Sequence, residues 1–166
     1  MKKINLILIF FMIGFTLMSK PQLPEILSDG MVLQQKSTVK IWGKSDAGKT
    51  VSISTSWGVE NKSAIADNNG NWLVMIETPE ASFTPYSITI SDGEEVVLNN
   101  ILIGEVWLAS GQSNMEMPLN GFWNNPIKDA NDVILNAGQY PAIRFVTIEK
   151  AQSFEPLETA KGKWQV

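Results

Sequence analysis

Short β-rich runs alternate with turn signals from residue 23 to about residue 103, and this alternation constrains the fold more than any other feature of the sequence. The runs contain many Val, Ile, Thr and aromatic residues, which favour strands, whereas Gly, Asn and Asp between the runs favour turns. The turn signals recur at intervals of about 8–15 residues, and no long helical period appears. This spacing predicts an antiparallel β-sandwich, in which two sheets bury their inner faces against each other.

The same reasoning places individual strands and turns. Turns are expected at DNNG (residues 67–70) and at Asp92-Gly93, because these residue types tolerate a positive φ. The run WLVMI (residues 72–76) is apolar throughout, which predicts a buried strand. The expected strands are residues 39–42, 51–54, 72–76, 86–90, 96–98 and 101–103. The expected core residues are Leu33, Val39, Ile41, Val51, Ile53, Trp72, Val74, Ile88 and Ile90.

The stretch GKSDAGKT (residues 43–50) matches the phosphate-loop pattern G-x-x-x-x-G-K-[ST]. In a true phosphate loop a helix follows, and its N-terminus faces the anion. Here VSIST follows, in which Val51 and Ile53 alternate with serines, and this alternation predicts a strand. We therefore interpret residues 43–50 as a hairpin that turns at residues 46–48, and not as a nucleotide site.

The composition excludes several function classes. A net charge of −4 and a sequence pI of about 4.8 disfavour nucleic acid as a partner, because an acidic chain repels phosphate. The chain has no cysteine, which excludes disulfides and a thiol nucleophile, and it has no histidine. His and Cys are the usual ligands of zinc and haem, so no metal is expected, and nothing in the sequence implies an organic cofactor.

The first 20 residues, MKKINLILIFFMIGFTLMSK, have the features of an export signal. Lys2 and Lys3 form a positive amino-terminal region, and residues 6–17 form an apolar run of signal-peptide length. An uncleaved membrane anchor is the alternative, but the run is shorter than the roughly 20 residues that span a bilayer. We predict that residues 1–19 are a signal peptide, and that the mature protein is periplasmic or extracellular without a membrane attachment.

The pattern changes in the last third of the chain. EVWLAS (residues 105–110) predicts a strand, PIKDANDVILNA (residues 126–137) predicts a helix that starts at Pro126, and IRFVTI (residues 143–148) predicts another strand. Residues 151–166 are expected to form a connecting loop. A strand, turn, helix and strand in this order are the beginning of an α/β layer.

Ser113 lies in GQSNM (residues 111–115), shortly after the predicted strand 105–110. Folds of the α/β class place their chemistry at the carboxyl ends of strands, so Ser113 is a candidate nucleophile. Gly111, Gln112 and Asn114 flank it and can donate hydrogen bonds to a developing oxyanion. The motif is not the G-x-S-x-G elbow, because residue 115 is Met.

GEVWLASGQSNMEMP (residues 104–118) resembles the first conserved block of the SGNH hydrolases, in the branch of the bacterial sialate O-acetylesterases and related carbohydrate esterases. LPEILSDGMVLQQ, VKIWGKSDAGKTVSI, DNNGNWLV and ISDGEEVVLNNILIGEVW resemble the amino-terminal β-domain of the same family. The resemblance extends from residue 23 to residue 166. It implies a β-sandwich over residues 20–103, followed over residues 104–166 by the incomplete start of an α/β hydrolase domain of the SGNH, flavodoxin-like type.

The resemblance implies that Ser113 attacks an acetyl ester on a sugar, with O-acetylated sialic acid or a related glycan as substrate. In the family, the imidazole base and its acidic partner come from a D-x-x-H segment far downstream, and no such segment is found here. The chain is thus expected to be the amino-terminal piece of a longer esterase and to be inactive alone.

One alternative is that the chain is a non-catalytic β-sandwich module that binds a glycan or a partner protein. Trp42, Trp57 and Trp72 are interpreted most simply as aromatic residues of the core or its rim. Trp57, however, lies beside a glycine in an expected loop, and an exposed indole there could stack on a sugar.

A second alternative concerns the base. Glu105, Glu116 or Asp129 could act as an unorthodox base for Ser113. Carboxylates are weak bases at neutral pH unless burial raises their pKa, so this mechanism would require a buried carboxyl group beside the serine.

Overall fold

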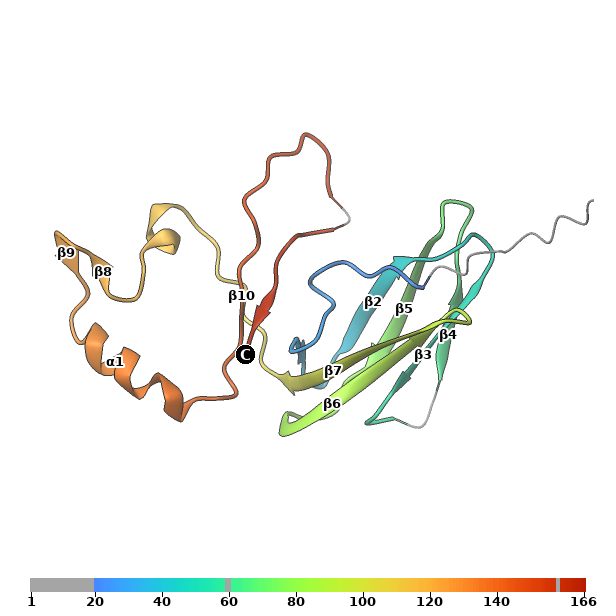
Figure 1. Ribbon diagram of the computed structural model, residues 1–166, viewed down its shortest axis with the longest axis horizontal. Helices are drawn as coiled ribbons and strands as arrows, with labels where there is room; N and C mark the ends of the chain where they lie inside the picture. Colours follow the sequence, from blue (N-terminus) through green and yellow to red (C-terminus); the bar gives the residue numbers. More distant parts are fainter. Residues whose placement is uncertain (1–19, 59–60, 158) are drawn as a thin grey trace, which may run out of the picture.

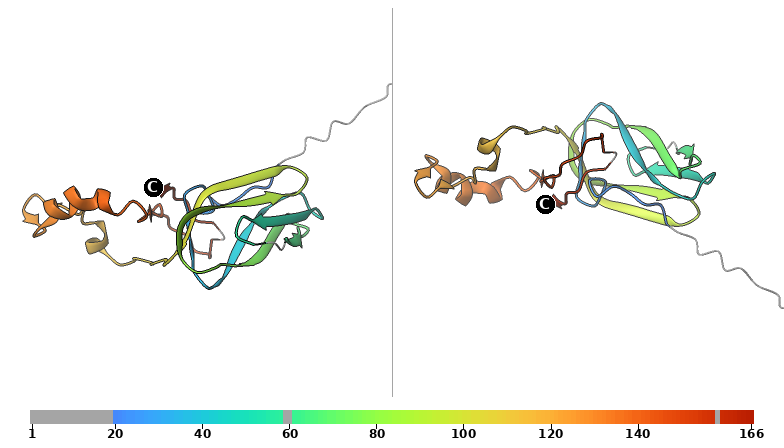
Figure 2. Two further views of the ribbon diagram at one scale, coloured as in Figure 1. Left: turned by 90° about the horizontal axis from the view of Figure 1, so that it is seen from below. Right: turned by 90° about the horizontal axis from the view of Figure 1, so that it is seen from above.

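The computed structural model describes residues 20–58, 61–157 and 159–166 (Figure 1). The predicted signal peptide, residues 1–19, lies outside the described residues. Within them the chain is mainly β, with one short α-helix. The β elements of the first two thirds form one body. The segment of residues 113–136 extends away from one end of this body, and the last residues of the chain return beside it (Figures 1 and 2).

A five-stranded mixed sheet forms most of the β region. Its strands are β1 (Val32–Gln34), β3 (Thr50–Thr55), β4 (Lys62–Ile65), β6 (Ser82–Ser91) and β7 (Glu95–Gly104), in the order β1–β7–β6–β3–β4. The pairs from β7 to β4 are antiparallel, but β1 runs parallel to β7, with Val32 opposite Leu102. The expectation of a wholly antiparallel arrangement is therefore wrong at this edge.

The strands β2 (Thr38–Lys44) and β5 (Asn71–Glu77) form a separate antiparallel pair. Ile41 lies opposite Val74 in this pair, and both are buried. The predicted strand 72–76 is present, but its side chains alternate: Trp72 is buried and Leu73 is about half exposed. An apolar run alone does not reveal that one face of a strand is open to solvent.

One hydrophobic core joins the two sheets. Ile41 and Val74 from the β2–β5 pair and Ile53, Ile88 and Ile90 from the five-stranded sheet belong to the same cluster of buried residues. Of the nine predicted core residues, eight are buried, and Val39 is half-buried at the edge of the cluster. The inward positions follow the period of two that strand geometry imposes.

Residues 45–49 connect the two sheets instead of closing a hairpin. The turn at Gly48 is present, with φ +79°, and β3 follows it, but β2 pairs with β5 and β3 pairs with β4 and β6. No helix follows the phosphate-loop pattern in this described stretch. The Lys49 ammonium lies 3.1 Å from the Asp46 carboxylate and 3.7 Å from that of Asp92, so its charge holds the loop.

The last third differs from the prediction in its element bounds. Residues 105–110 are not a strand, because β7 ends at Gly104. The helix α1 begins at Ala130 and not at Pro126, since Pro126 pairs with Gly121 and Asp129 adopts a left-handed φ of 60°. The elements are η1 (Ser113–Glu116), β8 (Gly121–Phe122), β9 (Asn125–Pro126), α1 (Ala130–Asn136), η2 (Ala137–Gln139), β10 (Phe145–Val146) and β11 (Trp164–Gln165).

The strands β10 and β11 form a separate two-stranded ladder within the last third, and Arg144 and Trp164 attach this ladder to the β region. The ladder replaces both the six-residue strand predicted at 143–148 and part of the loop predicted at 151–166. Arg144 donates to the carbonyl oxygen of Gly30 at 2.9 Å and to Asn100 Oδ1 at 2.8 Å. The indole ring of Trp164 packs against the core cluster. In the described part of the chain, no helix has the length and apolar character needed to cross a bilayer.

Candidate functional site

Ser113 is the first residue of η1, and its side chain is exposed. The strand β7 ends at Gly104, and residues 105–112, which carry no regular structure, separate that strand from Ser113. The expected position of Ser113 at the end of a strand is therefore wrong. Neither of the two cavities described below includes Ser113 in its lining.

Gly111 lies in close contact with Met115 in the turn before Ser113. A Cβ atom at this position would lie 2.9 Å from Cγ of Met115, so a larger residue here would require the Met115 side chain to move. The Met115 N–H donates to the carbonyl oxygen of Gln112 at 2.9 Å and closes the turn. The backbone hydrogen bond from Met115 to Gln112 therefore holds the turn that presents Ser113.

The start of η1 leaves backbone donors beside the Ser113 hydroxyl. The first N–H groups of a helix have no partner within it, and no side chain caps this one. The N–H groups of Ser113 and Asn114 are such donors. The Gln112 and Asn114 side chains are exposed, and among the residues that the structure describes neither they nor any other group hydrogen-bonds to the Ser113 hydroxyl. The turn thus offers a hydroxyl and two amide donors, but no base.

None of the three candidate carboxylate bases hydrogen-bonds to Ser113 in the described part of the chain. Glu105 accepts hydrogen bonds from Gln34 at 3.0 Å and from Gln35 at 2.6 Å, and these bonds hold the pKa of its carboxyl below the ordinary value. Glu116 forms an ion pair with Lys150. Asp129 precedes α1 and makes no side-chain capping bond. A lowered pKa makes Glu105 a weaker base, so this geometry disfavours the unorthodox mechanism.

Large apolar side chains are exposed throughout the last third of the chain. The exposed fraction is 86% for Trp107, 92% for Leu108 and 97% for Trp123. Exposed apolar area on this scale is typical of an interaction surface. Other exposed apolar residues of this segment include Leu135, Tyr140, Ile143, Phe145, Phe154 and Leu157.

The comparisons with known proteins point to one group of esterases. No protein-family model matches the chain. The sialate O-acetylesterase of Homo sapiens is 26% identical over 142 residues, and that of Rattus norvegicus is 28% identical over 142 residues. The crystal structure of a carbohydrate acetylesterase from Xanthomonas citri superposes with a TM-score of 0.75 at 31% identity, over 87% of this chain. The chain is a homologue of the sialate O-acetylesterases.

The homology covers only part of the related proteins. The match includes 80% of this chain but 26% of the human sialate O-acetylesterase, and the structural match includes 32% of the Xanthomonas citri acetylesterase. The chain therefore spans about a quarter of the length of the curated sialate O-acetylesterases that it matches.

In this sialate O-acetylesterase homologue, Trp57 is held by a ring contact and by a hydrogen bond. Its ring packs edge-on against Tyr86 with the centroids 5.4 Å apart, and its indole N–H donates to the carbonyl oxygen of Glu77 at 2.9 Å. A cavity of about 320 Å³ borders it. These contacts favour a packing role over the sugar-stacking role considered from the sequence.

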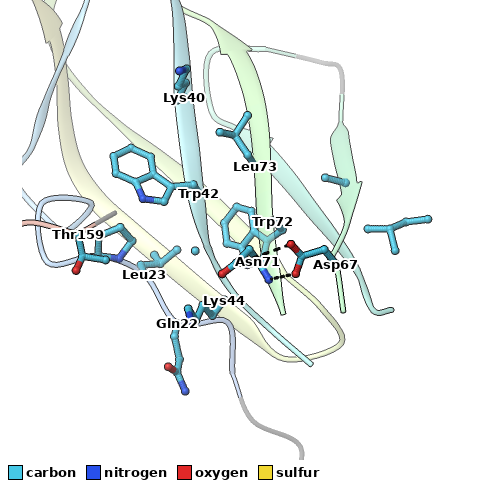
Figure 3. Close-up of a pocket in the computed structure, with 14 residues that line it drawn as sticks. Gln22, Leu23, Lys40, Trp42, Lys44, Asp67, Asn71, Trp72, Leu73 and Thr159 are labelled. Carbon is cyan, nitrogen blue, oxygen red and sulfur yellow. Dashed lines mark hydrogen bonds between the residues drawn. The ribbon is translucent and has the colours of Figure 1, made fainter. Parts of the chain in front are cut away.

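A larger cavity of about 630 Å³ lies along β2 and β5 and is bordered by Trp42 (Figure 3). Sequence reasoning treated Trp42 only as a core or rim aromatic. The signal that could have distinguished it is the alternation in β2, where Ile41 is buried and Trp42, on the other face of the strand, is only half-buried at the edge of the core. Among the described residues, no group of three or more acidic side chains is placed to hold a metal ion.

Proposed function

We propose that this chain supplies the nucleophile segment and the amino-terminal β region of an exported carbohydrate O-acetylesterase, with Ser113 as the nucleophile. The homology to the sialate O-acetylesterases is the observation that carries the proposal. The match extends over 80% of the chain, so only about a fifth of the chain lies outside it. Ser113 is further than that from either end of the chain, and it therefore lies inside the match. O-acetylated sialic acid or a related O-acetylated glycan is the proposed substrate.

The proposed chemistry is acyl transfer through Ser113. Its Oγ attacks the acetyl carbonyl carbon and gives its proton to a base. The tetrahedral intermediate then collapses to an acetyl-serine, and the sugar oxygen leaves as a hydroxyl group after it takes that proton from the base. Water then hydrolyses the acetyl-serine and releases acetate. The amides of Ser113 and Asn114 are the proposed oxyanion donors, because η1 does not use them.

The proposed reaction requires a base from outside these 166 residues. The chain contains no histidine, and a serine hydroxyl is a weak nucleophile without a base in hydrogen-bond reach. We infer that the exposed apolar side chains of residues 104–166 pack against the polypeptide that carries the base. The proposed arrangement is a β-sandwich over residues 20–103 and part of an SGNH hydrolase domain over residues 104–166, after a signal peptide at residues 1–19.

A chimera tests this proposal directly. The chain is fused to the part of the Xanthomonas citri acetylesterase that lies beyond the structural match, and hydrolysis of an activated acetyl ester is measured. The chimera is expected to hydrolyse the ester. Ser113→Ala in the chimera is expected to lower turnover on the order of 10⁶-fold, as loss of a serine nucleophile does in well-studied triad enzymes.

The matched control is Ser110→Ala, which removes another exposed serine from the same stretch and is expected to retain activity. A folded chimera that is inactive would contradict the proposed esterase. A folded chimera whose activity is unchanged by Ser113→Ala would contradict the assignment of the nucleophile.

A further inference from the structure

The cavity of about 630 Å³ along β2 and β5 is separate from the Ser113 turn. Its lining comes from β2, β4 and β5, from residues 22–24, and from Asp67 and Thr159. Its volume lies within the range of about 300–1,000 Å³ that is typical of small-molecule sites. Aromatic and aliphatic side chains with a few polar groups form its lining, which is also typical of such sites.

Two cations flank an indole ring along β2. Lys40, Trp42 and Lys44 are alternate residues of the strand, so their side chains leave the same face, and all three border the cavity (Figure 3). Successive members of this row are about 7 Å apart along the strand, given a rise of about 3.3–3.4 Å per residue. A ring-shaped ligand on Trp42 thus has an ammonium group within reach on either side.

The row formed by Lys40, Trp42 and Lys44 has apolar side chains beside it and polar side chains at one end. Leu23 and Pro24 border the cavity, and Leu73 lies opposite Trp42 on β5. Asp67 lies at the polar end, where its carboxylate accepts the N–H groups of Asn69 and Asn71 at 2.8 Å each and also attracts the Lys44 ammonium. In the described part of the chain, Lys40 has no carboxylate within ion-pair distance, so its charge remains available.

We propose that this cavity binds a pyranose that carries a carboxylate. The apolar C–H face of the sugar packs on the indole of Trp42, and the carboxylate pairs with Lys40 or Lys44. The site is independent of the proposed catalysis at Ser113, because Ser113 and its flanking residues do not line the cavity. Sialic acids and uronic acids both have this chemistry, and the experiment separates them.

The test is a titration of the whole chain followed by NMR. The six tryptophans each give an indole N–H signal. N-acetylneuraminic acid, glucuronic acid and the methyl ester of N-acetylneuraminic acid are added up to about 10 mM, since a single stacked sugar is expected to bind with a Kd on the order of 1 mM. We expect saturable shifts of the Trp42 signal with at least one of the two acids. The ester is expected to bind about threefold more weakly than its acid, the usual size for the loss of an exposed ion pair.

Two variants and two matched controls complete the test. Trp42→Ala is expected to weaken binding about tenfold, and the double variant Lys40→Gln/Lys44→Gln about threefold. Trp123→Ala and Lys128→Gln remove an exposed indole and an exposed ammonium elsewhere and are expected to leave binding unchanged. The lysine variant carries the test if Trp42→Ala does not fold.

The absence of any saturable shift with both acids would overturn the site. Equal affinity for the methyl ester and its acid, or unchanged binding by the lysine variant, would overturn the role of the carboxylate. Neither result bears on the chimera experiment, so failure of this proposal and failure of the esterase proposal remain distinguishable.

Discussion

The indole N–H of Trp164 donates a hydrogen bond of 2.9 Å to the carbonyl oxygen of Ile26. This bond joins β11 to a segment that precedes β1, and the Trp164 ring packs against the core cluster from outside. The last residues of the chain thus contact some of the first described ones. The attachment of the last third to the β region therefore depends on a small number of polar contacts that substitution can remove one at a time.

Trp164→Phe keeps an aromatic ring but removes the N–H donor. We expect a loss of about 1 kcal/mol in the free energy that holds the β10–β11 ladder on the β region, because the part-buried carbonyl of Ile26 loses its partner. Amide hydrogen exchange of Phe145 and Gln165 should accelerate, while exchange in β3 and β6 stays slow. Trp123→Phe is the control. Equal protection of the ladder in both variants would contradict the anchoring role.

Arg144→Lys tests the second anchor. The guanidinium donates to the backbone of Gly30 and to both the backbone and side chain of Asn100, and an ammonium cannot reproduce this fork. We expect a loss of about 2 kcal/mol, the usual size for hydrogen bonds to a charged group. Denaturant unfolding measures the change, with Lys128→Arg as the control at an exposed site. A loss below about 0.5 kcal/mol would contradict the prediction.

Ile53→Ala and Ile65→Ala form a matched pair in adjacent strands. Ile53 is 1% exposed in the shared core, and Ile65 is 69% exposed. Truncation of Ile53 is expected to cost about 2–5 kcal/mol, because it leaves a cavity, whereas truncation of Ile65 is expected to cost less than about 0.5 kcal/mol. Thermal or denaturant unfolding gives both values, and similar losses would contradict the description of the core.

Asp67→Asn tests a pH dependence. Backbone hydrogen bonds from Asn71 and then Asn69 hold the pKa of the Asp67 carboxyl below its ordinary value of 3.8. A lowered folded-state pKa adds stability above the ordinary pKa, and this stability is lost as the pH falls through the folded-state value. The wild-type chain should therefore be more stable than Asp67→Asn at neutral pH, and the difference should shrink below about pH 3.8.

Glu95→Gln is the control for that measurement, since Glu95 is exposed and makes no side-chain hydrogen bond within the described residues. Unfolding by denaturant at a series of pH values gives the stability of all three chains. If the difference in stability between wild type and Asp67→Asn stays constant into the acid range, the ionised carboxylate is not its cause.

The chain alone is expected to lack enzymatic ester hydrolysis. Ser113 has no base within the described residues, and the chain has no histidine. The purified chain and its Ser113→Ala variant should hydrolyse an activated acetyl ester equally slowly, beside a full-length relative as positive control. Turnover near that of the relative, abolished by Ser113→Ala, would contradict this prediction and require a base within these 166 residues.

The sequence by itself determined β2, β3, β5, β6 and most of the core, but it predicted no strand at β1 or β4 and divided β7 into two. Successive side chains of a strand point to opposite faces, so every second residue points inward. Ile41, Ile53 and Ile88 occupy such inward positions, and the alternation in the sequence predicts them. The turn residues at 67–70 and 92–93 likewise act locally, through the positive φ that Gly, Asn and Asp tolerate. The absence of histidine, and with it of an imidazole base, is also a property of the sequence alone.

Only the tertiary structure decided which strands pair. The sequence alone predicts that the loop at Gly48 closes a hairpin, but β2 and β3 join different sheets, because pairing depends on contacts between distant residues. The same reason explains the parallel edge at Val32 and the anchoring of Trp164 on Ile26. The outward side chains of Lys40, Trp42 and Lys44 border a cavity only because residues 22–24 and β5 lie beside them. These segments are distant from one another in the sequence, so only folding brings them together.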